Sequence, residues 1–121
     1  MRRDEELLQD ILEATERIGA SIMGVGEDQF NTNELLQSAV VHKLTVIGEA
    51  ARKLTPDFAT RHSDIPWADI VGFRNILVHA YFGIDWEVVW TIVSERLPQL
   101  NYEVCTILAA ERSDSSANQV D

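Results

Sequence analysis

The sequence predicts an all-α protein, an up-and-down bundle of four to five helices. Apolar residues recur at helical intervals along nearly all of the 121-residue chain, and no alternating pattern of useful strand length appears. Apolar residues make up 45% of the chain, as is usual for a soluble globular protein with one well-filled core. We therefore expect a single helical domain over residues 1–112 and a disordered polar tail over residues 113–121.

The first predicted helix covers about residues 4–23, with an apolar stripe opposite its acidic side chains. Two glycines in "GVGEDQFNT" end it, and Asn31 or Thr32 then caps a second helix that reaches about Leu54. Gly48 lies inside this second helix, where it costs about 1 kcal/mol relative to alanine. We expect this glycine to let a neighbouring helix approach closely.

The second half of the chain predicts two or three further helices. "LTPDFATRHSDIP" is expected to be a loop with at most one short helical turn, and Pro66 suits the first turn of a helix over about 66–80. "YFGID" ends that helix, and Asp85 can cap the next one. Pro98 is expected to kink or interrupt the last helical segment, which explains the count of four or five. We expect Cys105 in the core, and Trp67, Trp86 and Trp90 in the core or an interface.

The charge distribution excludes a broad nucleic-acid-coating surface but permits a local phosphate site. The net charge is −10. Five of the ten cations lie in residues 43–74, which carry only four acids, whereas the segments on either side are strongly acidic. Arg52 and Lys53 in this region are either solvated cations or part of a phosphate-binding path. We expect no DNA partner.

Several other classes of protein are not predicted. No apolar run approaches the roughly 20 residues that span a bilayer, and "MRRDEELLQD" has no apolar region typical of a secretory signal. One cysteine cannot form an intramolecular disulfide, no His/Cys cluster has metal-ligand spacing, and no glycine-rich phosphate loop is present. We expect a cytoplasmic protein with no metal and no cofactor of its own.

The stretch "FRNILVHAYFGID", residues 73–85, concentrates polar side chains in an apolar helix. On a helical wheel of about 100° per residue, the core stripe contains Leu77 and the residues within about 60° of it: Ile70, Phe73 and Ala80. Asn75 and His79 lie on the opposite face, one turn apart, with valines rather than charged residues beside them. This arrangement predicts a second contact surface, such as a partner helix or another subunit.

The residue types on this helix suit phosphate chemistry. The guanidinium of Arg74 can bind a phosphate and stabilise added negative charge, and His79 can transfer a proton near neutral pH. Asn75 can orient the imidazole or donate to a phosphate oxygen, and Tyr81 follows at the helix end. Such a set could cleave RNA without a metal through attack by the ribose 2′-OH. A twofold dimer would supply the second proton-transfer group.

The segment "IPWADIVGFRNILVHAYFGID" resembles the signature of HEPN-superfamily proteins of the HepT toxin type, with its R–x4–H–x–Y motif at Arg74, His79 and Tyr81. The similarity extends through "VIGEAARKLTPDF" and "WEVVWTIVSERLPQL", and so covers roughly residues 35–100. The resemblance implies a helical bundle that dimerises through the motif helix. It further implies a metal-independent endoribonuclease with Arg74 and His79 as the catalytic pair and Asn75 in support.

The resemblance also implies a toxin–antitoxin pair. Toxins of this type are encoded beside a minimal nucleotidyltransferase antitoxin of the MntA type, which uses ATP to transfer AMP onto the motif tyrosine, here Tyr81. The added phosphodiester charge and base would block the cleft where RNA binds.

Two alternatives remain open from the sequence. The protein could be a non-catalytic helical module that binds nucleotide phosphate or the surface of a minimal nucleotidyltransferase through Arg74 and His79, which the acidic net charge favours. It could also be a structural helical dimer with no activity, in which the polar cluster is only a helix end.

Overall fold

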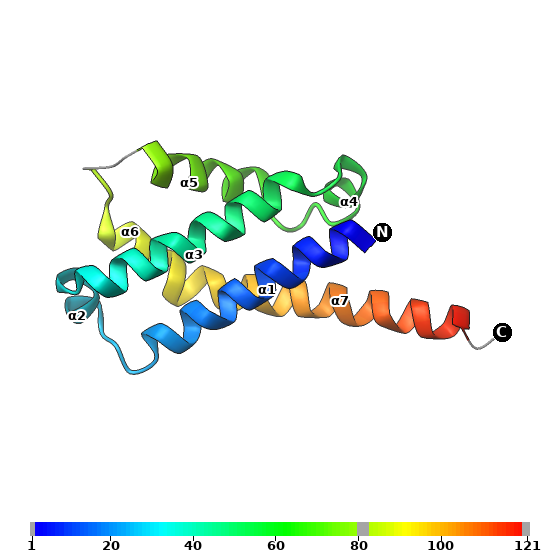
Figure 1. The fold of residues 1–121 in the computed structure, drawn as a ribbon, viewed down its shortest axis with the longest axis horizontal. Helices are drawn as coiled ribbons and strands as arrows, with labels where there is room; N and C mark the ends of the chain where they lie inside the picture. The colour runs from blue at the N-terminus through cyan, green and yellow to red at the C-terminus, as the bar shows by residue number, and fades with distance from the viewer. Residues whose placement is uncertain (1, 80–82, 120–121) are drawn as a thin grey trace.

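The computed structural model describes residues 2–79 and 83–119, and every regular element in this part of the chain is helical. Three long helices, α1 (Arg2–Ile22), α3 (Glu34–Lys53) and α5 (Trp67–His79), alternate in direction, and the last helical run returns beside them (Figure 1). The predicted all-α, up-and-down bundle is therefore confirmed.

A short helix, α2 (Glu27–Thr32), lies in the segment that the sequence predicts to be an irregular break. Asn33, rather than Asn31 or Thr32, caps α3, and its side chain accepts a hydrogen bond from the N–H of Leu36. The helix α2 is stabilised by a tertiary contact that local sequence cannot reveal. Phe30 is fully buried, with its ring centroid 5.9 Å from that of Trp86 and 5.3 Å from that of Trp90.

The expected short turn after α3 is the helix α4 (Pro56–Arg61). Thr55 caps it by accepting a hydrogen bond from the N–H of Phe58. The buried carboxylate of Asp4 in turn accepts hydrogen bonds from the N–H of Thr55, at 3.0 Å, and from its hydroxyl, at 2.7 Å. These bonds fix the beginning of α1 to the beginning of α4.

The last helical run consists of α6 (Trp86–Thr91), a π-helical segment η1 (Ile92–Arg96) and α7 (Leu97–Gln119), with no break between them. Asp85 caps α6, as predicted, by accepting from the N–H groups of Glu87 and Val88. Pro98 does not interrupt the helix. Its ring would collide with the carbonyl four residues earlier in a regular α-helix, and the wider turn of η1 precedes it instead. The backbone of α7 continues to Gln119, into the segment 113–121 for which we predict disorder.

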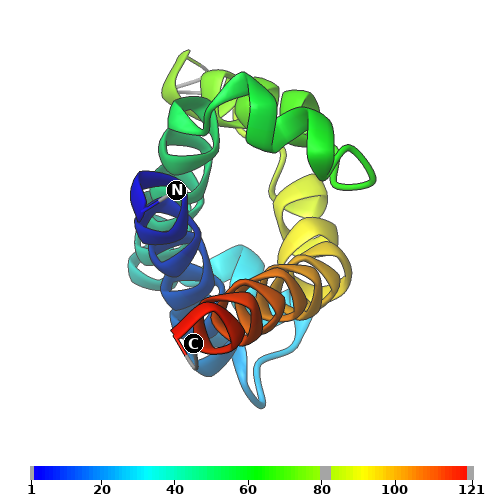
Figure 2. The same ribbon diagram turned by 90° about the vertical axis from the view of Figure 1, so that its right-hand side faces the viewer.

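The core lies among the long helices. Helix α1 packs against α3 and α7, while α5 lies on the other side of α3, far from α7 (Figure 2). The aliphatic side chains that fill the centre come from most elements, among them Leu8, Ile11, Ile18, Val40, Ile47, Leu77, Val89, Val93 and Val104. Cys105 is exposed rather than buried, because Val104 and Leu108 present the inward face of α7. Within the described residues, no helix is both long and apolar enough to cross a membrane.

Candidate active site

The motif helix α5 is an outer helix whose main packing partner is α3. Leu77 is buried and Phe73 is half-buried on the side that faces the bundle, whereas Asn75 and His79 are exposed. The predicted division of this helix into a core stripe and an outward polar pair is thereby confirmed for the described residues. Ala80, also predicted in the stripe, lies outside them.

Exposed apolar side chains lie on both sides of that polar pair. Val78 is 39% exposed, and Ile76, on the opposite flank, is 58% exposed. The valine flank is predicted from the sequence, but Ile76 is not, although it lies about 100° from Leu77 on the wheel. A surface helix normally turns its apolar residues toward the core, so this outward face is suited to a contact with another molecule.

Arg74 occupies a close contact between α5 and α3. A Cβ atom placed on Gly48 would overlap the Cβ and Cγ atoms of Arg74. The predicted role of Gly48, to allow a neighbouring helix to approach, is confirmed, and its neighbour is the candidate catalytic arginine. Only 26% of the Arg74 side chain is exposed.

The guanidinium of Arg74 is held at two of its nitrogens. Its Nη2 atom lies 3.2 Å from Oε2 of Glu49, the residue that follows Gly48 on α3. Its Nη1 group donates a hydrogen bond of 3.0 Å to Oδ1 of Asn75. The Nε–H group is buried and has no acceptor among the described residues, which is uncommon in folded proteins.

Glu49 connects Arg74 to the two cations at the end of α3. Nη2 of Arg52 lies 2.6 Å from Oε1 of Glu49, and Nζ of Lys53 lies 3.8 Å from the same atom. The hydrogen bond from Arg52 holds the pKa of the Glu49 carboxyl below its usual range. Partial desolvation opposes this effect, and the charges of Arg52, Arg74 and Lys53 reinforce it. The bond to Glu49 correspondingly raises the pKa of Arg52.

The structure thus gathers four of the six residues singled out in the sequence. Arg74, Arg52 and Lys53 surround the carboxylate of Glu49, and Asn75 accepts a hydrogen bond from Arg74. His79 stands further along α5, on its exposed face. Tyr81 lies outside the described residues. Sequence reasoning missed Glu49. Its spacing of three and four residues from Arg52 and Lys53 could have indicated a local ion pair, but not its contact with Arg74.

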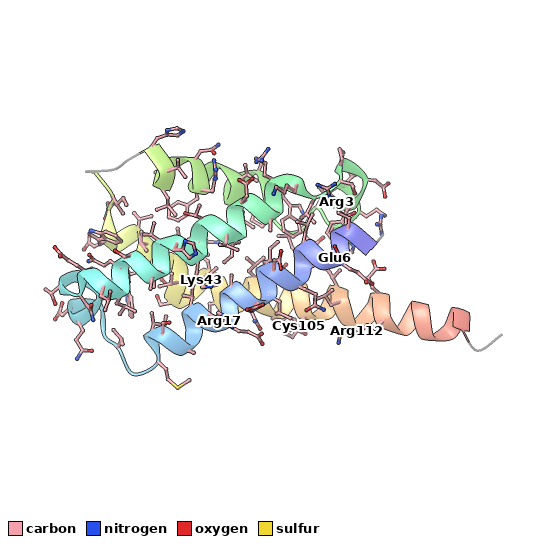
Figure 3. The ribbon with its side chains drawn as sticks, viewed as in Figure 1. Arg3, Glu6, Arg17, Lys43, Cys105 and Arg112 are labelled. Carbon is pink, nitrogen blue, oxygen red and sulfur yellow. The ribbon has the colours of Figure 1, made fainter. Side chains whose placement is uncertain are left out.

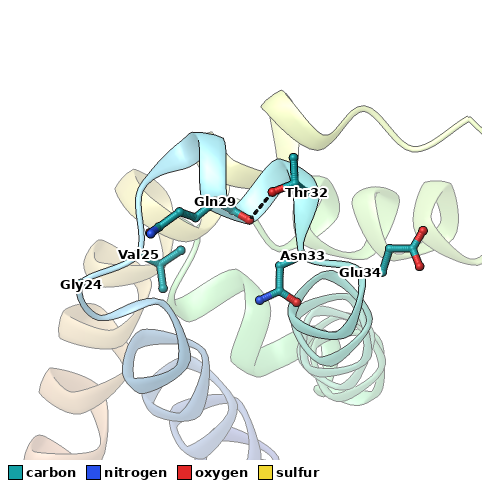
Figure 4. A pocket seen from close by; sticks show the side chains of 6 residues that line it. All are labelled: Gly24, Val25, Gln29, Thr32, Asn33 and Glu34. Carbon is teal, nitrogen blue, oxygen red and sulfur yellow. Dashed lines mark hydrogen bonds between the residues drawn. The ribbon is translucent and has the colours of Figure 1, made fainter.

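Two surface hollows lie away from this cluster. One is at the turn joining α1, α2 and α3 (Figure 4), lined by Gly24, Val25, Gln29, Thr32, Asn33 and Glu34. The other lies between α1 and α3, where Arg17 and Lys43 contribute to its lining (Figure 3). Of the motif, the described residues Arg74 and His79 line neither of them. Among the residues that the structure describes, no group of three His, Cys, Asp or Glu side chains is arranged to hold a metal ion.

Comparisons with known proteins give the family to which this chain is similar. The sequence model described as "Ribonuclease HepT-like" matches residues 11–107. No solved structure gives a significant match.

Three named relatives cover most of this chain. A Methanocaldococcus jannaschii protein named "Putative RNase MJ1380" is 38% identical, over 85% of this chain and 95% of its own. "Probable ribonuclease HepT" from Thermococcus cleftensis is 37% identical, over 82% and 90%. "Putative RNase TTE0752" from Caldanaerobacter subterraneus is 32% identical, over 93% and 100%. The chain therefore belongs to the HepT-like ribonuclease family.

Proposed function

We propose that the protein is a metal-independent endoribonuclease, the toxin of a toxin–antitoxin pair, with Arg74, Asn75 and His79 as its catalytic residues. The observation that carries the proposal is the difference in surroundings among the three residues on α5. Arg74 is fixed against α3, while Asn75 and His79 are exposed between two apolar flanks. The family membership and the names of the relatives support an RNA substrate.

In the proposed reaction His79 accepts the proton of a ribose 2′-OH, and the 2′-oxygen attacks the adjacent phosphorus. The bond from phosphorus to the 5′-oxygen breaks, and that oxygen leaves with a proton from a second acid. The products are a 2′,3′-cyclic phosphate and a free 5′-hydroxyl. The guanidinium of Arg74 stabilises the charge that accumulates on the phosphorane oxygens, and Asn75 orients Arg74 through the bond between them.

The proposed reaction needs a second proton-transfer group, and a homodimer supplies it. Arg74 and His79 are about 140° apart around the axis of α5, so one protomer does not present both on one face. A twofold contact between the outward faces of two α5 helices would bring each His79 toward the other copy's site and cover Ile76 and Val78. Arg52 and Lys53, close to Arg74 through Glu49, would extend the phosphate-binding path.

We predict that the purified protein cleaves RNA in the presence of EDTA, and that His79→Ala lowers the cleavage rate by about 100-fold or more. Gel analysis of a labelled RNA, with chemical identification of the cyclic phosphate end, measures both. A Thr106→Ala variant, changed at an exposed position of α7 and purified in the same way, is the control. A contaminating nuclease would be present in this preparation and in His79→Ala alike. Equal cleavage by wild type and His79→Ala would refute the assignment.

We further propose that a minimal nucleotidyltransferase antitoxin silences the protein by transferring AMP from ATP to Tyr81, with release of pyrophosphate, both partners being cytoplasmic. The toxin itself needs no cofactor. Co-expression with such a partner is predicted to increase the intact mass by whole AMP units, and Tyr81→Phe to abolish the increase, because the phenolic oxygen is the acceptor. An unchanged increase in Tyr81→Phe would assign the modification to another residue. AMP addition together with unaffected growth on expression without the partner would favour the non-catalytic binding module instead.

A further inference from the structure

We propose that Glu49, seated next to Gly48 on α3, is a positioning residue that fixes the guanidinium of Arg74 for transition-state stabilisation. This inference rests on the proposed function, because Arg74 is the group on which Glu49 acts. It assigns a role to a residue of α3 that does not touch the RNA itself.

Gly48 and Glu49 together contact both ends of the Arg74 side chain. The missing Cβ of Gly48 admits the first carbons of Arg74, and the carboxylate of Glu49 binds its far end at 3.2 Å. Asn75 holds the remaining Nη group from the motif helix itself. A side chain restrained at its base and at two nitrogens loses most of its rotamer freedom before substrate binds.

The partial burial of Arg74 and Glu49 distinguishes their ion pair from an exposed surface ion pair. Arg74 is 26% exposed and Glu49 is 31% exposed, whereas the pair between Arg17 and Glu13 on α1 is 62% exposed on both sides. Exposed pairs of the second kind contribute little, because water and salt compete for both charges. The pair to Arg74 also joins two helices, so it can fix one element relative to the other.

Glu49 does not neutralise the site, because the same carboxylate is shared by Arg52, Lys53 and Arg74. Three cations around one acid leave a positive excess where a phosphate would arrive. The carboxylate therefore sets the orientation of Arg74 while the surroundings still attract the substrate.

The test compares Glu49→Gln with wild type in steady-state RNA cleavage. Glutamine keeps the size of the side chain and removes its charge, so we expect kcat to fall by about tenfold to a hundredfold while KM changes little. Glu49→Asp, which keeps the charge and shortens the reach, should recover part of the lost kcat. Glu13→Gln makes the same substitution in an exposed Glu–Arg pair of α1, outside the motif, and should leave both constants unchanged.

A second measurement, which does not depend on RNA cleavage, monitors the side chain of Arg74 directly. Its Nε–H resonance in proton–nitrogen correlation spectra is assigned by its loss in Arg74→Lys. In wild type we expect slow exchange with solvent, because this group is buried, and in Glu49→Gln we expect faster exchange. Circular dichroism and the thermal midpoint establish that Glu49→Gln is folded.

The two proposals fail in different ways. If wild type shows no His79-dependent cleavage, the proposed function falls, and the Arg74 resonance still decides whether Glu49 holds the guanidinium. If wild type cleaves RNA but Glu49→Gln keeps its kcat, or loses only substrate affinity, the positioning role is overturned. A faster Glu49→Gln enzyme would also overturn it, because Glu49 would then restrain Arg74 from its substrate.

Discussion

At the scale of single residues, the most informative contact is that between Gly48 and Arg74. Glycine in the middle of a long helix lowers helix stability, yet α3 keeps one where α5 crosses it. The absence of a side chain there determines how closely the two helices pack. Because Arg74 also pairs with Glu49, the same position controls both the packing of α5 and the placement of a proposed catalytic group.

Replacing glycine by alanine at two helical positions should have opposite effects on stability. Gly48→Ala is expected to destabilise the protein by about 1–3 kcal/mol, because the new Cβ overlaps Arg74 and the helices must separate. Gly19→Ala in α1 is expected to stabilise it by about 0.5–1 kcal/mol, because no side chain or neighbouring helix of the described residues lies within 4 Å of the added Cβ.

Urea unfolding at matched protein concentration measures both free energies of unfolding. Gly19→Ala serves as the control for the intrinsic helix preference of alanine. If Gly48→Ala were as stable as Gly19→Ala, the close approach of α5 would not depend on this glycine.

At the scale of elements, α5 differs from α1 in being apolar on more than one side. Helix α1 presents one apolar stripe to the core and acids elsewhere, whereas α5 has Leu77 inside and Ile76 and Val78 outside. The irregularity of the π-helical segment η1 is unrelated to any apolar face, since η1 accommodates Pro98 without ending the helix. The outward face of α5 is the surface through which we propose that the dimer forms, whereas η1 keeps the last helical run continuous.

A charge on the outward face of α5 should separate the proposed dimer. Ile76→Glu is expected to give a folded monomer, because Ile76 is already 58% exposed in the protomer and a buried carboxylate is unfavourable only in the dimer. Light scattering after size-exclusion chromatography measures the mass, and RNA cleavage should fall with it.

Tyr102→Glu provides the matched control for that substitution. Tyr102 is 72% exposed on α7, which lies across the bundle from α5 (Figure 2). We expect this variant to keep the mass and activity of wild type. A dimeric Ile76→Glu protein would exclude this face of α5 as the contact.

At the scale of the whole molecule, an acidic protein carries a local positive cluster. The net charge of −10 disfavours general binding of polyanions. Three cations nevertheless surround Glu49, and we propose that this local cluster binds a single RNA phosphate rather than a long stretch of RNA backbone. This distribution fits an enzyme that acts on selected RNA positions better than a protein that coats nucleic acid.

The sequence alone determined the helices with strong periodicity, the capping role of Asp85 and the outward direction of Asn75 and His79. These features depend on spacings of three to four residues, which a helix fixes locally. The position of Gly48 inside a predicted helix also indicated that a neighbouring helix approaches closely there. The motif itself carried the resemblance to the family that the comparisons then confirmed.

Only the tertiary structure decided which residues meet across helices. The existence of α2 depends on Phe30 packing against Trp86 and Trp90, and the position of Arg74 depends on Gly48 and Glu49. Each of these contacts joins residues far apart in the chain. Their pairing follows from how helices pack, and local periodicity states only that a face is buried, not what covers it.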